Sequence, residues 1–225
     1  MAKSLKQKNQ PQLITFVVSN AIALGVIALG LPQLLNLLQE LSKGNWTIVG
    51  KLIAIPAFLT LVTGTIGWAM PRAAKESIVF WKTGRHCLPS SRAFTAIGPV
   101  DPRVDMKQLL IKHGPFPTEC KEQTALWYRI YRTHTSDTSV EDAHGAYLRF
   151  REMATLAVAF IVVGIACNAF FDVPFKRDVI GVLLLGVEYL IVMFAARNAA
   201  THLVSNVLAL ESVKITSEEP KQKQD

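Results

Sequence analysis

The chain has 225 residues, of which 50% are hydrophobic and 18% are charged, and its formal net charge is +7. This composition excludes an intrinsically disordered chain, because disorder goes with low hydrophobicity and high net charge. It also argues against an ordinary soluble domain, because the apolar residues fall in four long runs. The net charge points to no ligand by itself, since many of the cations gather where they govern membrane orientation.

Each of the four runs approaches the length of about 20 predominantly apolar residues that a helix needs to cross a bilayer. They cover residues 13–31, 52–70, 153–171 and 179–196. The first run has 19 residues, whereas the apolar core of a cleaved signal peptide has about 7–15. The sequence therefore predicts four retained transmembrane helices.

The distribution of lysine and arginine predicts the orientation of these helices. Residues 1–12 hold three lysines and no acidic residue, and segment 71–152 has 13 Lys and Arg against 9 Asp and Glu. Segment 172–178 has two of each. Because cytoplasmic loops carry an excess of Lys and Arg, we expect both termini and segment 71–152 in the cytoplasm.

The predicted fold is an all-α integral membrane protein with four transmembrane helices and a small helical cytoplasmic domain inserted between the second and third spans. Its expected parts are a cytoplasmic N-terminal segment (1–12), a first transmembrane helix pair (13–70), a cytoplasmic helical domain (71–152), a second transmembrane helix pair (153–196), and a cytoplasmic amphipathic helix with a disordered tail (197–225). The amphipathic helix needs a surface on which to bury its apolar face, either the insert or another subunit.

Local signals predict the elements of the insert. Residues 73–82 are expected to continue the second span as helix, and the Gly- and Pro-containing segment 83–100 predicts a loop or a short pair of strands. Asp101, followed by proline, predicts the N-cap of a helix that stops at Gly114. From Val140 the helical pattern runs into the third apolar run without a break, which predicts one long helix.

Glu188 lies near the middle of the fourth run, where a charge costs about 2.5 kcal/mol or more on insertion scales. Asn20, Thr60 and Thr63 lie at similar depth, and Asn168 lies in the third run. The simpler interpretation is a protonated glutamic acid hydrogen-bonded to one of these side chains or to another subunit. The functional alternative is a proton or cation site of a small channel or transporter subunit.

Two groups of cations in the insert are candidates for binding a ligand or partner. Arg85 and Arg92 lie in the long segment 83–100 and have the chemistry to bind a phosphate of a nucleotide or lipid. Trp127, Arg129 and Arg132 combine an aromatic ring with cations, as in sites that stack on bases or clamp phosphates. The simpler interpretation places Trp127 and Tyr131 in the core, with both arginines facing water or lipid headgroups.

Metal, cofactor and enzyme chemistry have little support in the sequence. Four of the five histidines and two of the three cysteines lie in the insert, but their spacing matches no zinc pattern. We therefore predict no metal site, no cofactor and no catalytic residue. A membrane enzyme acting on a lipid or peptide through His144 or Cys87 is a further alternative, although no nucleophile or phosphate-loop motif accompanies them.

The layout of two spans, a helical cytoplasmic insert and two further spans resembles that of four-span membrane effectors of bacterial antiphage systems. This resemblance of architecture implies a non-enzymatic inner-membrane protein whose cytoplasmic domain binds a partner or small anionic ligand and couples that event to the transmembrane bundle. The expected partners are membrane lipids, further copies of the chain in a homo-oligomer and a cytoplasmic protein. Nucleic acid is not an expected partner.

Overall fold

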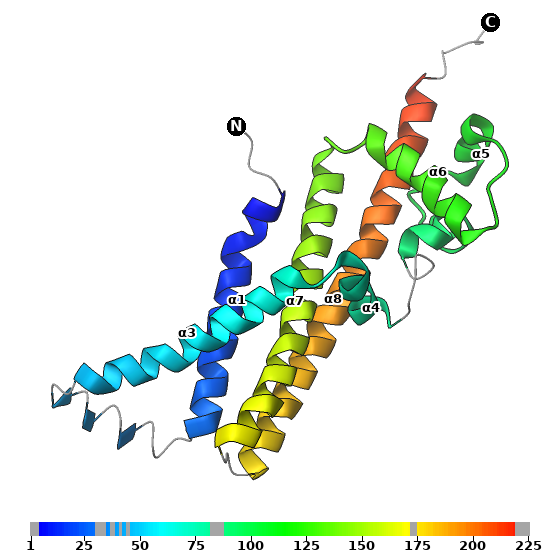
Figure 1. The fold of residues 1–225 in the computed structure, drawn as a ribbon. Helices are drawn as coiled ribbons and strands as arrows, with labels where there is room; N and C mark the ends of the chain where they lie inside the picture. The colour runs from blue at the N-terminus through cyan, green and yellow to red at the C-terminus, as the bar shows by residue number, and fades with distance from the viewer. Residues whose placement is uncertain are drawn as a thin grey trace, which may run out of the picture. The chain divides into compact units, whose positions relative to one another are not determined.

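The computed structural model describes residues 5–29, 35–36, 39–40, 42–43, 46–81, 88–171 and 175–218. Every regular element in these ranges is helical, which confirms the all-α class for the described part of the chain (Figure 1). The chain divides into two compact units. Unit 1 comprises Met1–Lys75 and Arg149–Met193, and unit 2 comprises Glu76–Leu148 and Phe194–Asp225.

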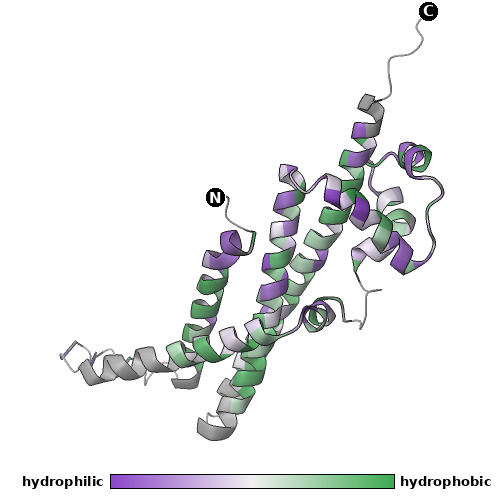
Figure 2. Ribbon diagram, turned by 45° about the horizontal axis from the view of Figure 1, so that its top comes forward, coloured by the Kyte–Doolittle hydropathy of each residue, from purple (hydrophilic) through white to green (hydrophobic). Residues whose placement is uncertain are grey.

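Unit 1 is built from four apolar helical stretches. They belong to α1 (Leu5–Leu29), α3 (Trp46–Ala69), α7 (Thr138–Phe171) and α8 (Phe175–Glu218), of which α7 and α8 also contribute to unit 2. Figure 2 shows a hydrophilic start of α1 followed by a hydrophobic remainder. The helix begins before the predicted run because its polar N-terminal residues, mostly Lys and Gln, are themselves good helix formers.

The core of unit 1 lies between α1, α7 and α8, with α3 at its margin. The residues of this core are Val17, Ala21, Leu156, Phe160, Val163 and Leu185, with Val62 of α3 packed against them. Gly67 brings α3 close to α7, because a Cβ atom at this position would lie 2.9 Å from Leu156 Cδ2. Small residues permit such close helix approaches in apolar bundles.

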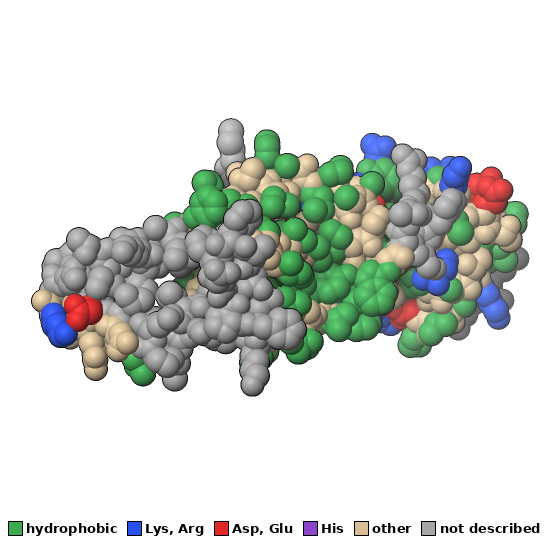
Figure 3. Space-filling model, turned by 60° about the horizontal axis from the view of Figure 1, so that its bottom comes forward, with side chains coloured by type: hydrophobic (Ala, Val, Ile, Leu, Met, Phe, Trp, Pro, Cys, Tyr) green, Lys and Arg blue, Asp and Glu red, His purple; other side chains and the backbone are tan. Residues whose placement is uncertain are grey.

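The outer face of unit 1 is strongly apolar. Ile22 of α1 is 51% exposed and Leu183 of α8 is 63% exposed, and Figure 3 shows hydrophobic side chains gathered on one face of the molecule. Within the described residues, two stretches are long and apolar enough to cross a membrane, Gln7–Ile27 and Val179–Lys214. An apolar surface of this extent is normally covered by lipid or by another protein.

The segment after the second span is helical as predicted, but it does not continue that span. Helix α3 ends at Ala69, and a separate helix, α4 (Arg72–Phe80), begins after Pro71. Proline has no backbone N–H to donate to the preceding turn, and its ring clashes there. The carbonyl of Pro71 instead accepts the N–H of Lys75 and so opens α4.

The segment before α5 (Met106–His113) also differs from expectation. Residues 89–100 form three short helical turns, η2 (Pro89–Arg92), η3 (Ala93–Ile97) and η4 (Gly98–Val100), in place of the strands weighed above. Asp105, not Asp101, caps α5, because its side chain accepts hydrogen bonds from the N–H groups of the second and third helical residues. The carboxylate of Asp101 is instead engaged by Arg103.

Unit 2 has a core to which α8 contributes a central row of side chains. Leu203, Val204, Val207 and Leu208 of α8 pack with residues of η3, α5, α6 (Cys120–Thr133) and α7. The amphipathic C-terminal helix therefore packs on the insert of its own chain, one of the two expected surfaces. The long helix expected from Val140 into the third run is confirmed, since α7 is continuous over 34 residues. The expected disordered tail falls almost entirely on residues 219–225, outside the described residues.

Gly98 is a sensitive point of this core. A Cβ atom there would lie 2.7 Å from Met106 Sδ and 3.1 Å from the carbonyl oxygen of Ala93. We expect Gly98→Ala to lower the free energy of unfolding by about 1–3 kcal/mol, the usual cost of overpacking. Denaturation of the full-length protein in detergent measures the effect. Gly64→Ala is the matched control, because nothing lies within 4 Å of its added Cβ, and equal losses in both variants would contradict the packing argument.

Candidate functional site

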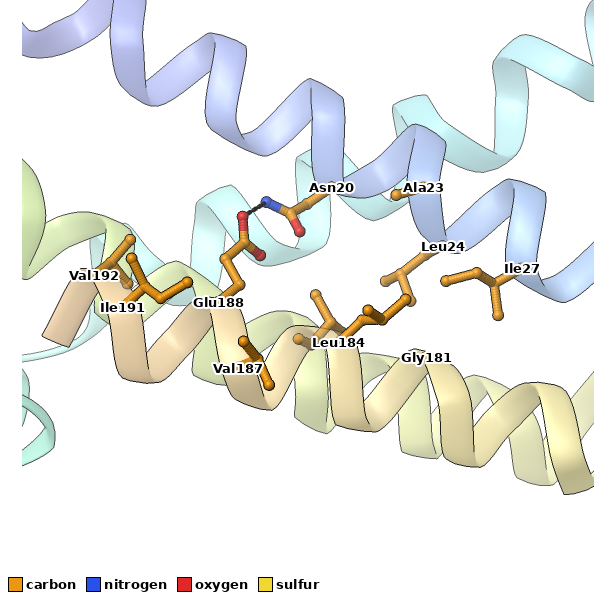
Figure 4. Close-up of a pocket in the computed structure, with 11 residues that line it drawn as sticks. Asn20, Ala23, Leu24, Ile27, Gly181, Leu184, Val187, Glu188, Ile191 and Val192 are labelled. Carbon is orange, nitrogen blue, oxygen red and sulfur yellow. Dashed lines mark hydrogen bonds between the residues drawn. The ribbon is translucent and has the colours of Figure 1, made fainter.

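Glu188 of α8 and Asn20 of α1 form a hydrogen-bonded pair inside unit 1. Asn20 Nδ2 donates to Glu188 Oε1 at 3.1 Å, as Figure 4 shows. The same nitrogen donates to the carbonyl oxygen of Phe16, one turn earlier on α1, at 3.0 Å. Asn20 is buried and Glu188 is half-buried, so the carboxyl retains access to the space beside the two helices.

A groove of about 480 Å³ runs beside this pair, and we call it the α1–α8 groove. It is lined by Asn20, Ala23, Leu24 and Ile27 of α1 and by Gly181, Leu184, Leu185, Val187, Glu188, Ile191 and Val192 of α8 (Figure 4). Asn20 and Glu188 are the two polar side chains in this lining. The groove is therefore an apolar cleft between α1 and α8 with one polar position, formed by Asn20 and Glu188.

The other predicted intramembrane polar residues have different surroundings. Thr63 is fully buried, and its hydroxyl donates to the carbonyl oxygen of Thr60 within α3 at 3.4 Å. Asn168 lies in α7, but its side chain lies outside the described residues. Of the five polar residues predicted for the spans, the structure brings Asn20 and Glu188 together.

The predicted cations of the insert lie on the surface of unit 2. Arg92 of η2 and Arg129 and Arg132 of α6 are exposed, whereas Arg85 lies outside the described residues. The turn η2 packs on α6, and Ser90 Oγ donates to Thr124 Oγ1 at 3.5 Å. We call Arg92, Tyr128, Arg129 and Arg132 the basic surface.

Two neighbouring aromatic residues of α6, Trp127 and Tyr128, differ in exposure. Trp127 is 8% exposed and belongs to the core of unit 2, where its ring stacks on Tyr131 at 5.3 Å. Its indole therefore lies on the side of α6 that faces the core and is not accessible to a ligand. Tyr128, which lies in the same predicted stretch of aromatic and basic residues, is 55% exposed and lies 5.8 Å from the Tyr131 ring. Its spacing of four residues from Arg132 along α6 places both on one face of the helix.

Gln123 fixes the turns beside the basic surface. Its buried side chain accepts hydrogen bonds from the Phe94 N–H at 3.2 Å and from Thr95 Oγ1 at 3.3 Å. Its Nε2 atom donates to the carbonyl oxygen of Thr118 at 3.2 Å. Because one buried amide satisfies backbone groups of η3 and of the chain before α6, it holds these elements in a fixed arrangement.

A buried carboxylate, Glu211 of α8, is the centre of a polar cluster in unit 2. Its Oε1 lies 2.9 Å from His113 Nε2 and 3.0 Å from Lys112 Nζ, both of α5. Its Oε2 lies 2.8 Å from Nε2 of His134, which follows α6 and whose Nδ1 lies 2.8 Å from Asp137 Oδ2. We call these five residues the Glu211 cluster.

The electrostatics of Glu211 follow from these contacts. Burial alone raises the pKa of its carboxyl, but hydrogen bonds with His134, Lys112 and His113 outweigh burial and lower the pKa to about 2. Sequence reasoning missed Glu211. The available signal was its spacing of four residues from Val207, which places a carboxyl on the apolar stripe of an amphipathic helix.

Neither a metal site nor a similarity to a known protein indicates what the Asn20–Glu188 pair, the basic surface or the Glu211 cluster does. In the part of the chain that the structure describes, no group of three or more His, Cys, Asp or Glu side chains is arranged to hold a metal ion. His144 Nδ1 is hydrogen-bonded to Tyr131 Oη at 2.9 Å, and Cys87 lies outside the described residues. No protein-family model, curated protein or solved structure matches the chain.

The Glu211 cluster predicts a pH-dependent stability. The pKa of Glu211 falls from 4.5 to about 2 on folding, so its contribution is complete above pH 4.5 and is lost as the pH falls toward 2. At pH 7 we expect Glu211→Gln to lower the free energy of unfolding by about 2–3 kcal/mol, the scale of hydrogen bonds to a buried charge. The difference between wild type and variant should shrink between pH 4.5 and 2, measured by denaturation in detergent.

The control for this measurement is Glu122→Gln on the exposed side of α6. A surface substitution of this kind changes stability by no more than about 0.5 kcal/mol. A Glu211→Gln deficit that is independent of pH would show that packing, and not ionic contacts, explains the burial of this side chain.

Proposed function

We propose that the chain is a non-enzymatic, multi-pass protein of a bacterial inner membrane, with unit 1 in the bilayer and unit 2 in the cytoplasm. The apolar stretches Gln7–Ile27 and Val179–Lys214 support two of the spans. The apolar runs 52–70 and 153–171 lie almost entirely within α3 and α7 and are the remaining two. The excess of Lys and Arg in segment 71–152 supports the cytoplasmic location of unit 2.

The length of α8 supports a division of this helix between membrane and cytoplasm. A helix rises about 1.5 Å per residue, so the 36 residues of Val179–Lys214 exceed the bilayer core of about 30 Å. Its first half, 179–196, contains one charged residue, Glu188. Its second half contributes Arg197 and Glu211 to the polar contacts of unit 2. We therefore assign residues 179–196 to the fourth span.

In this proposal the basic surface binds a small anionic ligand or an acidic segment of a cytoplasmic protein. Three exposed arginines lie on two elements that pack together, and the exposed ring of Tyr128 adjoins them in sequence. Guanidinium groups bind phosphate and carboxylate through paired N–H donors. The buried contacts of Gln123 hold η3 and the chain before α6 against α6, so the helix that carries Arg129 and Arg132 is fixed in place before a ligand arrives.

The observation that carries the proposed coupling is the continuity of α7 and α8. Val140 of α7 belongs to the core of unit 2 and Phe160 to the core of unit 1. Leu185 and Val207 of α8 are divided between the two cores in the same way. A continuous helix can shift or rotate as one body, so an event at the basic surface can act on the spans.

The proposed assembly is a homo-oligomer, because the exposed apolar face of α8 is suited to contacts between copies. The proposed biological role is that of a membrane effector in antiphage defence. A second candidate is a small channel or transporter subunit, favoured by the position of Glu188 in the α1–α8 groove. This candidate predicts an ion flux into liposomes that Glu188→Gln abolishes.

The topology can be tested at Cys120, a free and partly exposed cysteine of unit 2. In a variant that lacks the other two cysteines, we expect a membrane-impermeant maleimide to label Cys120 only after spheroplasts are permeabilised. Labelling of intact spheroplasts would place unit 2 outside the cytoplasm. A cysteine introduced at Lys3 in place of Cys120 should behave in the same way, because two spans separate the two positions and so put both on one side.

The coupling can be tested with the charge-reversing variant Arg92→Glu, Arg129→Glu, Arg132→Glu. We expect cells that express the wild-type chain with its neighbouring genes to lose membrane potential on phage challenge, and the triple variant to keep it. Lys107→Glu is the control, because Lys107 is an exposed cation on α5, outside the basic surface. Depolarisation without challenge that requires Glu188 would favour the transporter, and an unchanged potential in every strain would contradict both.

A further inference from the structure

The two N–H donors of Asn20, at the polar position of the α1–α8 groove, both already have hydrogen-bond acceptors. A primary amide has two N–H hydrogens. Asn20 Nδ2 donates to Glu188 Oε1 and to the carbonyl oxygen of Phe16, which occupies both. The second contact also fixes the orientation of the amide, because an amide oxygen in place of the nitrogen would face the Phe16 carbonyl.

What remains available in the groove accepts hydrogen bonds. Among the described residues, no hydrogen bond or ion pair engages Glu188 Oε2 or Asn20 Oδ1. An ionised carboxylate accepts and does not donate, and the same holds for an amide oxygen. A carboxylate in an apolar environment is strongly destabilised unless a cation or donors compensate its charge. With Glu188 ionised, the polar position is therefore complementary to a cation or a hydrogen-bond donor.

The rest of the groove is complementary to an apolar body. Apart from Asn20 and Glu188, its lining consists of aliphatic side chains and Gly181. Its volume of about 480 Å³ lies within the range of about 300–1,000 Å³ that is typical of small-molecule sites. Gly181 leaves this space open, because an added Cβ would lie 3.3 Å from Ile27 Cγ2 across the groove.

We propose that the α1–α8 groove binds a hydrophobic cation, an ammonium or phosphonium group with apolar arms, whose charge lies against Glu188. A lipid acyl chain would cover the aliphatic walls but would leave Glu188 Oε2 without a partner. A second copy of the chain offers the same acceptors and no cation from the groove itself. The inference rests on the membrane placement of unit 1 in the proposed function. It is independent of the basic surface and of whether the cation is transported.

The test is equilibrium dialysis of tetraphenylphosphonium against the full-length protein in phosphatidylcholine nanodiscs, with empty nanodiscs as the background. We expect saturable binding to the wild type. Glu188→Gln keeps the shape of the side chain and removes its charge, so binding should weaken at least tenfold. Glu188→Asp keeps the charge and should bind within a few-fold of wild type. Triphenylphosphine oxide, a neutral hydrogen-bond acceptor of similar shape, should not bind saturably.

A steric variant tests the location without changing any charge. Gly181→Leu should fill the groove and weaken binding, whereas Gly186→Leu on the same helix should not, because nothing lies within 4 Å of a Cβ at Gly186. Unchanged helical circular dichroism and gel filtration identify the folded variants. Equal binding by wild type and Glu188→Gln, or by the cation and the neutral oxide, would overturn the inference.

A separate measurement distinguishes failure of this inference from failure of the proposed function. If alkaline carbonate extracts the chain from membranes, the placement of unit 1 in the bilayer is wrong. The proposed cation site, which rests on that placement, is then wrong as well. If the chain stays in the membrane and binding ignores Glu188, the placement stands and the cation site alone is wrong. Loss of the phage response in the arginine variant bears on neither result.

Discussion

The contacts of Glu211 determine how unit 2 is assembled. One carboxylate on α8 is bonded to two side chains of α5 and to His134 after α6. Removal of it would leave Nε2 of the buried His134 and of the half-buried His113 without this acceptor, which costs more than an exposed ion pair contributes. The last turns of α8 are therefore fixed to the insert by polar contacts as well as by the apolar row that includes Val207. The insert is consequently not a domain closed on itself, because its core includes a helix that lies outside it in the sequence.

Helix α8 carries two carboxyl groups whose surroundings differ, and these surroundings favour a structural role for one and a binding role for the other. Glu211 is 4% exposed, and both of its oxygens are engaged by basic side chains. Glu188 is half-buried, has one described donor and faces an apolar groove. A fully satisfied buried network makes a structure rigid, whereas a partly satisfied polar group in an apolar groove is a candidate binding position. The same residue type on one helix thus supports the fold at one position and, in our proposal, binds a ligand at the other.

The apolar runs made the helices predictable. Because Asn20 and Glu188 lie at similar depth in their runs, their pair was one of the few partnerships that the sequence predicted for Glu188. What sequence reasoning missed depends on neighbours that periodicity does not identify. Asp101 precedes a proline as an N-cap would, but Arg103 takes its carboxylate, and Asp105 caps α5. His113 and His134 lie 98 and 77 residues from Glu211 along the chain. A helical stripe shows which face of α8 is buried and does not show which side chains lie opposite. The break at Pro71 was a local signal whose effect was underestimated.

The geometry of unit 1 gives the proposed coupling a physical mechanism. The bond between Asn20 and Glu188 joins α1 to α8 at 3.1 Å, near the upper limit of a useful hydrogen bond. A shift of α8 along its axis by about 1.5 Å, the rise of one residue, would break a contact of this length. Any event that moves α8 therefore changes the partners available to Glu188, and with them the affinity of the groove for a cation. By thermodynamic linkage, a cation that binds the two positions of α8 with different affinity must shift the helix in return. In the proposed function, the groove and the basic surface would then act on one equilibrium through α8, which lines the groove and packs with α6 and η3 in the core of unit 2.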